Sequence, residues 1–214
     1  MVLEIYNDYS FEAEALQTEK KKTSICLHYT AGWNVEGAYE TLKKIDKIAV
    51  HFIVGTDGKV YGTLPVDKWG YHLGIKGSQG YLDRTSISIE IVNIGTLTEK
   101  GNDLYCWTGK KYCSKTETDK FVDYKTNWRG YRYFASFPDV QLAKVAHLCG
   151  YLTKRYDIPP IIVNAPLVYQ EFNKIKDFQG IFTHCTVRSN DKWDVGPAFD
   201  FKEFEKRMIY YYQN

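Results

Sequence analysis

A short segment near the C-terminal end of the chain concentrates side chains that bind metals or move protons. Residues 183–201 read THCTVRSNDKWDVGPAFDF and include His184, Lys192 and Asp194. His184 and Asp194 are ten positions apart, so both reach one ion only if the chain between them turns back, as Ser189-Asn190-Asp191 allows. A catalytic zinc site needs three protein ligands and an open fourth position. This segment offers two ligands, and the third must come from elsewhere.

A second histidine lies at the end of a predicted strand near the start of the chain. The run Ser24–Tyr29 alternates like a β-strand, and Thr30-Ala31-Gly32 ends it. His28 therefore stands where site residues gather in sheet-based folds. In isolation such a histidine more often packs in the core, but beside the C-terminal segment it becomes the third ligand that we expect.

A carboxylate interrupts another predicted strand. Residues 85–93 alternate polar and apolar side chains, as in a strand. Glu90 is the one charged side chain among them, where an uncharged residue is expected. Burial of an unpaired carboxylate is costly, so Glu90 must be paired, hydrated or functional. A structural salt bridge is the alternative to a catalytic role.

These strings resemble the zinc-dependent N-acetylmuramoyl-L-alanine amidases, the family of phage lysozyme-type amidases and peptidoglycan recognition proteins. In that pattern a His, a Lys eight positions later and an Asp or Cys ten positions later precede G-P-x-F-D, as His184, Lys192, Asp194 and Gly196–Asp200 do here. The strings L-H-Y-T-A-G, H-F-I-V-G-T-D-G-K-V-Y and S-I-S-I-E also match family segments. The resemblance spans roughly residues 23–201 and is weakest in two long connections.

The resemblance implies a zinc hydrolase that cleaves the amide between N-acetylmuramic acid and the L-alanine of the stem peptide. His28, His184 and Asp194 are the expected zinc ligands. Glu90 is expected to transfer the proton, and Lys192 to balance charge on the amide oxygen, although an exposed loop lysine is the alternative for Lys192.

Two positions qualify these assignments. Cys185 follows His184 directly, but neighbouring side chains normally diverge, so Asp194 is the better third ligand. Phage lysozyme-type members carry a catalytic tyrosine where this chain has Val50. A mechanism that relies on that phenol is therefore not expected here.

The remaining histidines and one tryptophan receive separate expectations. His72 lies in W-G-Y-H-L-G, which resembles a turn beside the metal cleft, so His72 and Trp33 are the candidate substrate-contacting residues; an exposed loop histidine is the equal alternative for His72. His51, inside an apolar strand, is expected in the core, and His147 is expected on the solvated side of a helix.

The surrounding pattern predicts a single α/β domain with a central mixed sheet flanked by helices. The elements expected are strands at 24–29, 48–54, 60–62, 85–93 and 180–183, and helices at 37–47, from 136 to about 156, and 201–212. Asp57-Gly58 predicts a hairpin between two of the strands, and Ser136 is the candidate cap of the long helix.

The domain organisation follows from changes in composition. Residues 1–22 are expected to be an N-terminal extension on the surface, 23–201 the catalytic domain, and 202–214 a C-terminal helix or tail. The stretch at about 95–135 mixes Tyr and Trp with polar residues without a sustained period. It is expected to be an insertion bordering the cleft, suited either to sugar or peptide contact or to packing on its own side chains.

Bulk properties exclude several classes of function. The chain of 214 residues has 28 basic and 26 acidic side chains, and this gives no broad field for nucleic acid. No apolar run has membrane-spanning length, and no signal peptide is expected, although a removed leader stays open. The five cysteines include one close pair, Cys106 and Cys113, which we expect as free thiols rather than a disulfide.

Three functions remain after these exclusions. The favoured one is a zinc amidase with peptidoglycan or muropeptides as substrate. A non-catalytic peptidoglycan-binding module and a zinc hydrolase of another amide are the alternatives. The sequence leaves open the oligomeric state, and whether the protein acts in the cytoplasm or is delivered to the cell wall.

Overall fold

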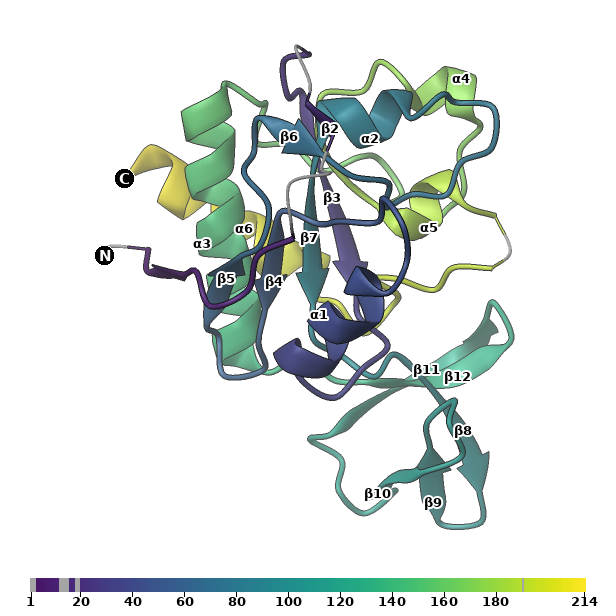
Figure 1. Ribbon diagram of the computed structural model, residues 1–214. Coiled ribbons are helices and arrows are strands. Elements are labelled where there is room, and N and C mark those ends of the chain that lie inside the picture. Colours follow the sequence, from purple (N-terminus) through teal and green to yellow (C-terminus); the bar gives the residue numbers. More distant parts are fainter. Residues whose placement is uncertain (1–2, 12–15, 18–19, 190) are drawn as a thin grey trace.

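A six-stranded mixed sheet forms the centre of the protein (Figure 1). The computed structural model describes residues 3–11, 16–17, 20–189 and 191–214. The sheet order is β1-β5-β4-β7-β3-β13, and every neighbouring pair is parallel except the β4/β5 hairpin. The strands are β1 (Ile5–Tyr6), β3 (Ser24–Tyr29), β4 (Phe52–Val54), β5 (Val60–Gly62), β7 (Ser86–Ile91) and β13 (Gly180–Thr183). The predicted mixed α/β fold and the hairpin are confirmed.

The two central strands are buried on both faces. All six residues of β7 are buried, as are all residues of β3 except Tyr29. Parallel strands covered on both sides read as nearly continuous apolar runs, which explains why their sequences predicted strands so well. A charged side chain in β7 is therefore forced into the interior.

Two long helices cover one face of this sheet. α3 (Asp139–Tyr156) and α6 (Phe201–Gln213) pack against each other and against the sheet (Figure 1). Gly150 allows their close approach, because a Cβ there would lie 2.8 Å from the carbonyl oxygen of Met208. The amphipathic face of α3 (Leu142, Val145, Cys149 and Leu152) lies in the main core as predicted.

Two expectations about α3 are wrong. Ser136 does not cap it, since the N-cap residue is Pro138, which lacks a side-chain donor or acceptor. His147 is not solvated, because α6 covers it and its ring stacks on Tyr211 with centroids 4.1 Å apart. Periodicity within one helix could not reveal that a second helix lies on its other side.

Four shorter helices connect the strands: α1 (Val35–Lys43), α2 (Tyr81–Thr85), α4 (Phe172–Ile175) and α5 (His184–Val187). α1 begins two residues before the predicted start, because the side chain of Asn34 accepts a hydrogen bond from the Gly37 N–H and so caps the helix. Near the N-terminus, β1 extends the main sheet, and β2 (Leu16–Gln17) pairs with β6 (Lys68–Trp69).

The region at 95–135 folds as a separate antiparallel sheet that projects from the body (Figure 1). Its order is β10-β9-β8-β12-β11. Its strands are β8 (Thr96–Lys100), β9 (Asp103–Tyr105), β10 (Lys111–Ser114), β11 (Phe121–Trp128) and β12 (Tyr131–Ala135). A small core that includes Leu97, Leu104 and Tyr133 holds it together. Cys106 and Cys113 lie in this core as free thiols.

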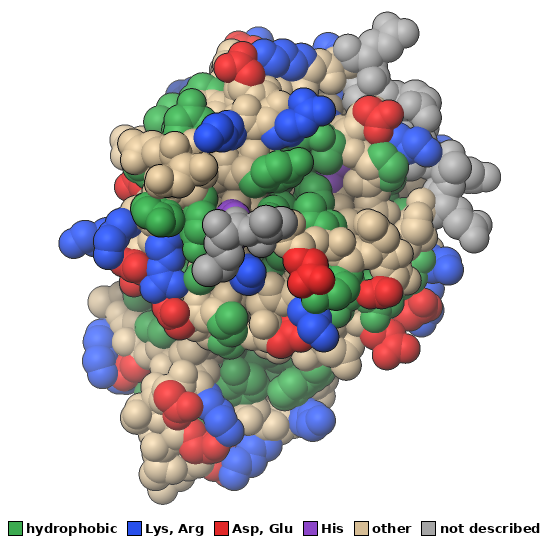
Figure 2. Space-filling model, turned by 90° about the vertical axis from the view of Figure 1, so that its left-hand side faces the viewer, with side chains coloured by type: hydrophobic (Ala, Val, Ile, Leu, Met, Phe, Trp, Pro, Cys, Tyr) green, Lys and Arg blue, Asp and Glu red, His purple; other side chains and the backbone are tan. Residues whose placement is uncertain are grey.

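The surface carries both signs of charge. Figure 2 shows acidic and basic side chains interspersed over the face that it presents. None of the helices in the described ranges is both long and apolar enough to cross a bilayer.

Candidate metal centre and active site

The main sheet delivers the predicted site residues to one edge. β3 lies between β7 and β13, all three run parallel, and their carboxyl ends meet there. His28 is the second-last residue of β3 and pairs in register with Glu90 on β7. His184 directly follows β13 and begins α5. Ligands bind at the carboxyl ends of strands in such sheets, so this edge is the expected place for a site.

Three predicted ligands meet at this edge. The Nδ1 atoms of His28 and His184 are 2.9 Å apart, and the Oδ2 atom of Asp194 lies 3.1 Å from the first and 2.9 Å from the second. All three residues are buried. Burial by itself would raise the pKa of the Asp194 carboxyl, and positive charge at the two imidazoles is what holds that pKa well below its usual range.

A chain of hydrogen bonds fixes the tautomer of His28. The Ser86 hydroxyl donates to the Leu82 carbonyl at 2.5 Å, so it must accept from Nε2–H of His72 at 3.0 Å. Nδ1 of a neutral His72 is then an acceptor, and Nε2–H of His28 donates to it at 2.9 Å. Burial, and then the neighbouring His28, hold the pKa of His72 well below its usual value and keep it neutral. Nδ1 of His28 is therefore left with a free lone pair.

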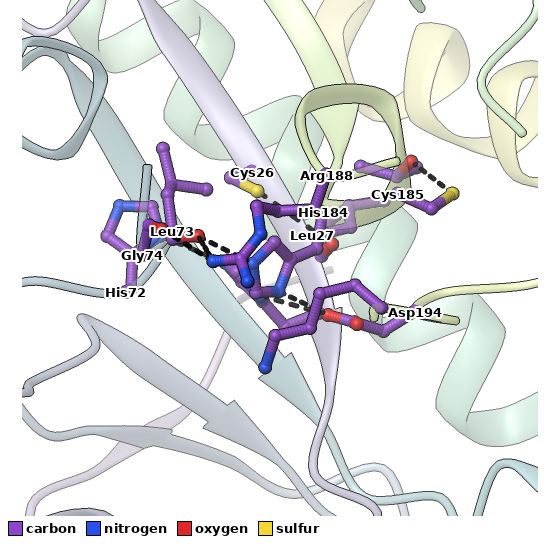
Figure 3. Close-up of polar contacts among 12 residues, drawn as sticks. Cys26, Leu27, His72, Leu73, Gly74, His184, Cys185, Arg188 and Asp194 are labelled. Carbon is purple, nitrogen blue, oxygen red and sulfur yellow. Dashed lines mark hydrogen bonds and ion pairs between the residues drawn. The ribbon is translucent and has the colours of Figure 1, made fainter. Parts of the chain in front are cut away.

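His184 is oriented in a similar way. Its Nε2 atom lies 3.0 Å from the Leu73 carbonyl, which can only accept, so Nε2 carries the proton and Nδ1 carries a lone pair. Figure 3 shows His184 and Asp194 pointing toward each other, while the side chain of Arg188 extends to the carbonyls of Leu73 and Gly74. Such outer partners typically orient metal-binding histidines.

The donor set fits a zinc ion. Two imidazole lone pairs and a carboxylate oxygen converge without a proton between them, which is unfavourable unless a cation is present. Ligands of a tetrahedral zinc site are separated by roughly 3.3 Å, a little more than the spacing seen here. Small side-chain movements therefore suffice to hold the ion.

A second group of possible ligands shares His28 but suits a metal less well. It consists of Cys26, His28 and His72. Within it, the His28 and His72 nitrogens already form a direct hydrogen bond. Burial raises the pKa of the Cys26 thiol well above its usual value, and Cys26 does not line the cleft. The group with His184 and Asp194 is the better candidate for a hydrolytic centre.

Glu90 lies beside these ligands without a partner for one of its oxygens. Its side chain is buried, and Oε2 has no hydrogen-bond partner among the residues described. Burial raises the pKa of Glu90 to about 7; a proton on His28 would oppose the rise, and the negative charge of Asp194 adds to it. No ion pair with Glu90 is found in the described ranges, so the alternative of a structural salt bridge is not supported. A carboxyl with this pKa suits proton transfer near neutral pH.

These groups open into a cleft of about 540 Å³. Its lining includes the apolar side chains of Leu42, Ile48 and Val50 and the basic side chains of Lys192 and Arg188. The volume suits a small ligand that is held by an apolar wall and a few polar groups. Val50 lines the cleft and is almost fully buried. Because it is a valine, this position supplies no phenol to the site.

The two candidate substrate-contacting residues occupy different places. His72 lines the cleft, but its imidazole is buried and both ring nitrogens have protein partners, so the alternative of an exposed histidine is wrong. Trp33 is 45% exposed and is not among the residues that line the cleft. His51, as expected, is a core residue bound to Ser88 and to the Lys68 carbonyl.

Sequence reasoning missed one residue that supports the site. Arg129, in the turn between β11 and β12, donates to the carbonyls of Cys185, Arg188 and Lys192. The indole N–H of Trp193 donates back to the Arg129 carbonyl at 2.9 Å. The insertion therefore holds the loop that carries Lys192 and Asp194. No local signal marks this contact, because the partners are 56 to 63 positions apart.

Comparison of the sequence with protein-family profiles finds a matching family. Residues 18–197 match the sequence profile of the Amidase_2 family, described as N-acetylmuramoyl-L-alanine amidase. No curated protein sequence gives a significant match.

Solved structures of amidases share the fold. AmiA of Staphylococcus aureus aligns with a TM-score of 0.57 at 14% identity, over 98% of this chain and 83% of that one. LysC of Clostridium intestinale aligns with a TM-score of 0.54 at 15% identity, over 96% and 97%. AmiD of E. coli, in complex with anhydro-N-acetylmuramic acid-L-Ala-D-gamma-Glu-L-Lys, aligns with a TM-score of 0.53 at 20% identity, over 92% of this chain but 60% of that one. These likenesses establish a common fold.

Proposed function

Because the chain belongs to the N-acetylmuramoyl-L-alanine amidase family, we propose that it is a zinc-dependent hydrolase of the amide between N-acetylmuramic acid and L-alanine. The observation that carries this proposal is the convergence of His28, His184 and Asp194 on one point of the cleft, with both histidine lone pairs directed there. AmiD, which shares the fold, was solved with a muramoyl peptide of this type.

Two polar side chains of the cleft have a proposed role beside the metal ligands. A bound zinc ion polarises a carbonyl and lowers the pKa of water. Glu90 accepts a proton from the attacking water and returns it to the departing amine, since its raised pKa lets it exchange protons near pH 7. Lys192 lies on the same cleft and balances the negative charge that develops on the amide oxygen.

Lys192 also has a defined backbone position. The guanidinium of Arg129 holds the Lys192 carbonyl, and Asp194 follows two residues later. The ammonium group is therefore attached to a loop that is fixed at both ends, which supports a role for it beyond that of a solvated surface lysine.

Zinc binding and muropeptide cleavage test the proposal together. Purified protein is expected to bind about one zinc ion per chain and to release the free stem peptide from muropeptides, as seen by mass spectrometry. Zinc binding with intact muropeptide would favour a binding module. Cleavage at a different amide would favour a zinc hydrolase of another substrate, and either result would overturn the proposed reaction.

A further inference from the structure

Exposed aromatic side chains gather where the insertion meets the body. Trp107, between β9 and β10, is 67% exposed, and Trp33, between β3 and α1, is 45% exposed. The half-buried ring of Tyr112 on β10, which also packs against the core of the insertion, lies 5.8 Å from that of Trp33, centroid to centroid. Large apolar side chains that cluster at the surface mark sites of interaction more often than isolated ones do.

The protein holds these rings in defined orientations. The indole N–H of Trp107 donates to the Ala31 carbonyl at 2.8 Å, so Trp107 is attached by its edge while most of its surface stays open. The ammonium of Lys110 lies 4.8 Å from the ring centroid of Trp33. Rigid aromatic surfaces cost little conformational entropy when a ligand binds.

This aromatic surface adjoins the cleft at Ala31. Tyr29, Thr30 and Ala31 directly follow the candidate ligand His28 and line the cleft. Trp107 is bonded to Ala31 itself. A polymer whose scissile amide lies at the metal centre can therefore extend across the rim onto these rings.

The distribution of charge suggests which part of the substrate lies where. Stem peptides carry carboxylates, and the cation Lys192 lies inside the cleft, where Arg188 is already paired with Asp191. On the aromatic surface the cation Lys110 is placed over Trp33. Pyranose rings present C–H groups that pack on aromatic faces, and their hydroxyl groups bond to polar neighbours.

We propose that Trp33, Trp107 and Tyr112 form a platform that binds the glycan strand of peptidoglycan next to the muramoyl residue being cleaved. The platform rests on the proposed function for the position of the amide. It makes this chain selective for polymeric or glycan-bearing substrate over a single muramoyl peptide.

Substrate length provides the first test. Trp107→Ala is expected to lower kcat/KM on polymeric peptidoglycan by up to about tenfold, and to change it less than about twofold on a single muramoyl peptide. Trp107→Phe keeps an aromatic face but loses the bond to Ala31. Its kcat/KM on polymeric peptidoglycan should lie between those of the parent protein and Trp107→Ala. Tyr210→Ala is the matched control, since Tyr210 is 61% exposed on α6, and should leave both substrates unaffected. Equal losses on polymer and single muramoyl peptide would overturn the platform.

Binding provides a second test that does not need catalysis. The inactive variant Asp194→Ala should bind peptide-free glycan strands in calorimetry, and the added change Trp107→Ala should weaken that binding by about tenfold. Absence of glycan binding, or Trp107-dependent binding of free stem peptide instead, would overturn the proposal. If the parent protein binds glycan but cleaves no muropeptide, the proposed function fails while the platform stands.

Discussion

The two sheets of the protein differ in what they contribute to the site. In the six-stranded sheet, β3 and β7 are buried on both faces and present His28 and Glu90 in register. In the insertion sheet, β11 is exposed over much of its length. Arg129, directly after β11, donates to backbone carbonyls of residues 185–192, which lead to the candidate ligand Asp194 and are called the metal loop below. His28 and Glu90 thus lie on the most constrained strands, while the insertion positions the loop that carries Lys192 and Asp194. Changes in the first sheet should abolish chemistry, and changes in the second should modulate it.

The largest effect is expected at the metal centre. Asp194→Ala should weaken zinc binding more than about 100-fold and remove activity, because it deletes one of three convergent ligand atoms. Zinc titration against a competing chelator measures the loss. Glu205→Ala removes an exposed carboxylate on α6 and serves as the control. Full zinc affinity in Asp194→Ala would mean that the ligands are assigned wrongly.

Glu90→Gln should separate metal binding from chemistry. The substitution keeps the shape of the side chain but removes its ability to take a proton, so the rate should fall about 10² to 10⁴-fold while zinc binding is retained. Single-turnover cleavage of a muropeptide and zinc titration of the same sample provide the measurement. A variant that cleaves at the parent rate would remove Glu90 from the mechanism.

Arg129→Ala tests the contribution of the insertion. It leaves three carbonyls of the metal loop without their donor, so zinc affinity should fall by about tenfold, without loss of the fold. Arg132→Ala is matched to it, because Arg132 lies on the neighbouring strand and pairs with Asp123 at the surface. If both variants bind zinc equally well, the insertion does not position the loop, and the contrast between the sheets is weaker than proposed.

The smallest effect concerns a buried lysine in the body. Lys22 donates to the Ser86 carbonyl at 3.0 Å, and burial lowers the pKa of Lys22 from 10.5 to about 7. Because the pKa of Lys22 is lower in the folded state than in the unfolded state, burying its charge destabilises the fold. This destabilisation is largest below pH 7 and disappears as the pH rises toward 10.5. Lys22→Met should therefore stabilise the protein by about 1–3 kcal/mol at pH 7, and less at pH 10.

Chemical denaturation at several pH values checks this prediction. Lys21→Met is the control, since the adjacent Lys21 side chain is 64% exposed and pairs with Asp157. A stabilisation in Lys22→Met that does not change between pH 7 and pH 10 would show that the charge of Lys22 is not its source.

The elements that were predictable are those whose local pattern matches their burial. β3 and β13 and the β4/β5 hairpin follow from apolar runs and the Asp57-Gly58 turn. The insertion strands were not predicted, because register shifts interrupt their pairing between Lys111 and Cys113 and between Asp123 and Trp128. Such irregularities break the alternation by which a strand is recognised.

The candidate site divides in the same way. The spacing of His184 and Asp194, and the position of His28 at the end of a strand, are sequence features that predict one metal centre. The role of His72 could not be foreseen, because the tautomer of His28 depends on a chain of contacts through His72 and Ser86 to the Leu82 carbonyl. Arg129 was missed for the same reason, since its partners lie far along the chain.

The sequence by itself determined the types of the reacting groups and the strands that carry them, because both depend on residue identity and short-range periodicity. Only the tertiary structure decided which nitrogen of each histidine faces Asp194, how the insertion holds the loop that carries Lys192 and Asp194, and where Trp107 lies relative to the cleft. Those features depend on hydrogen bonds between segments distant in the chain, and their geometry exists only once the sheets and loops have packed together.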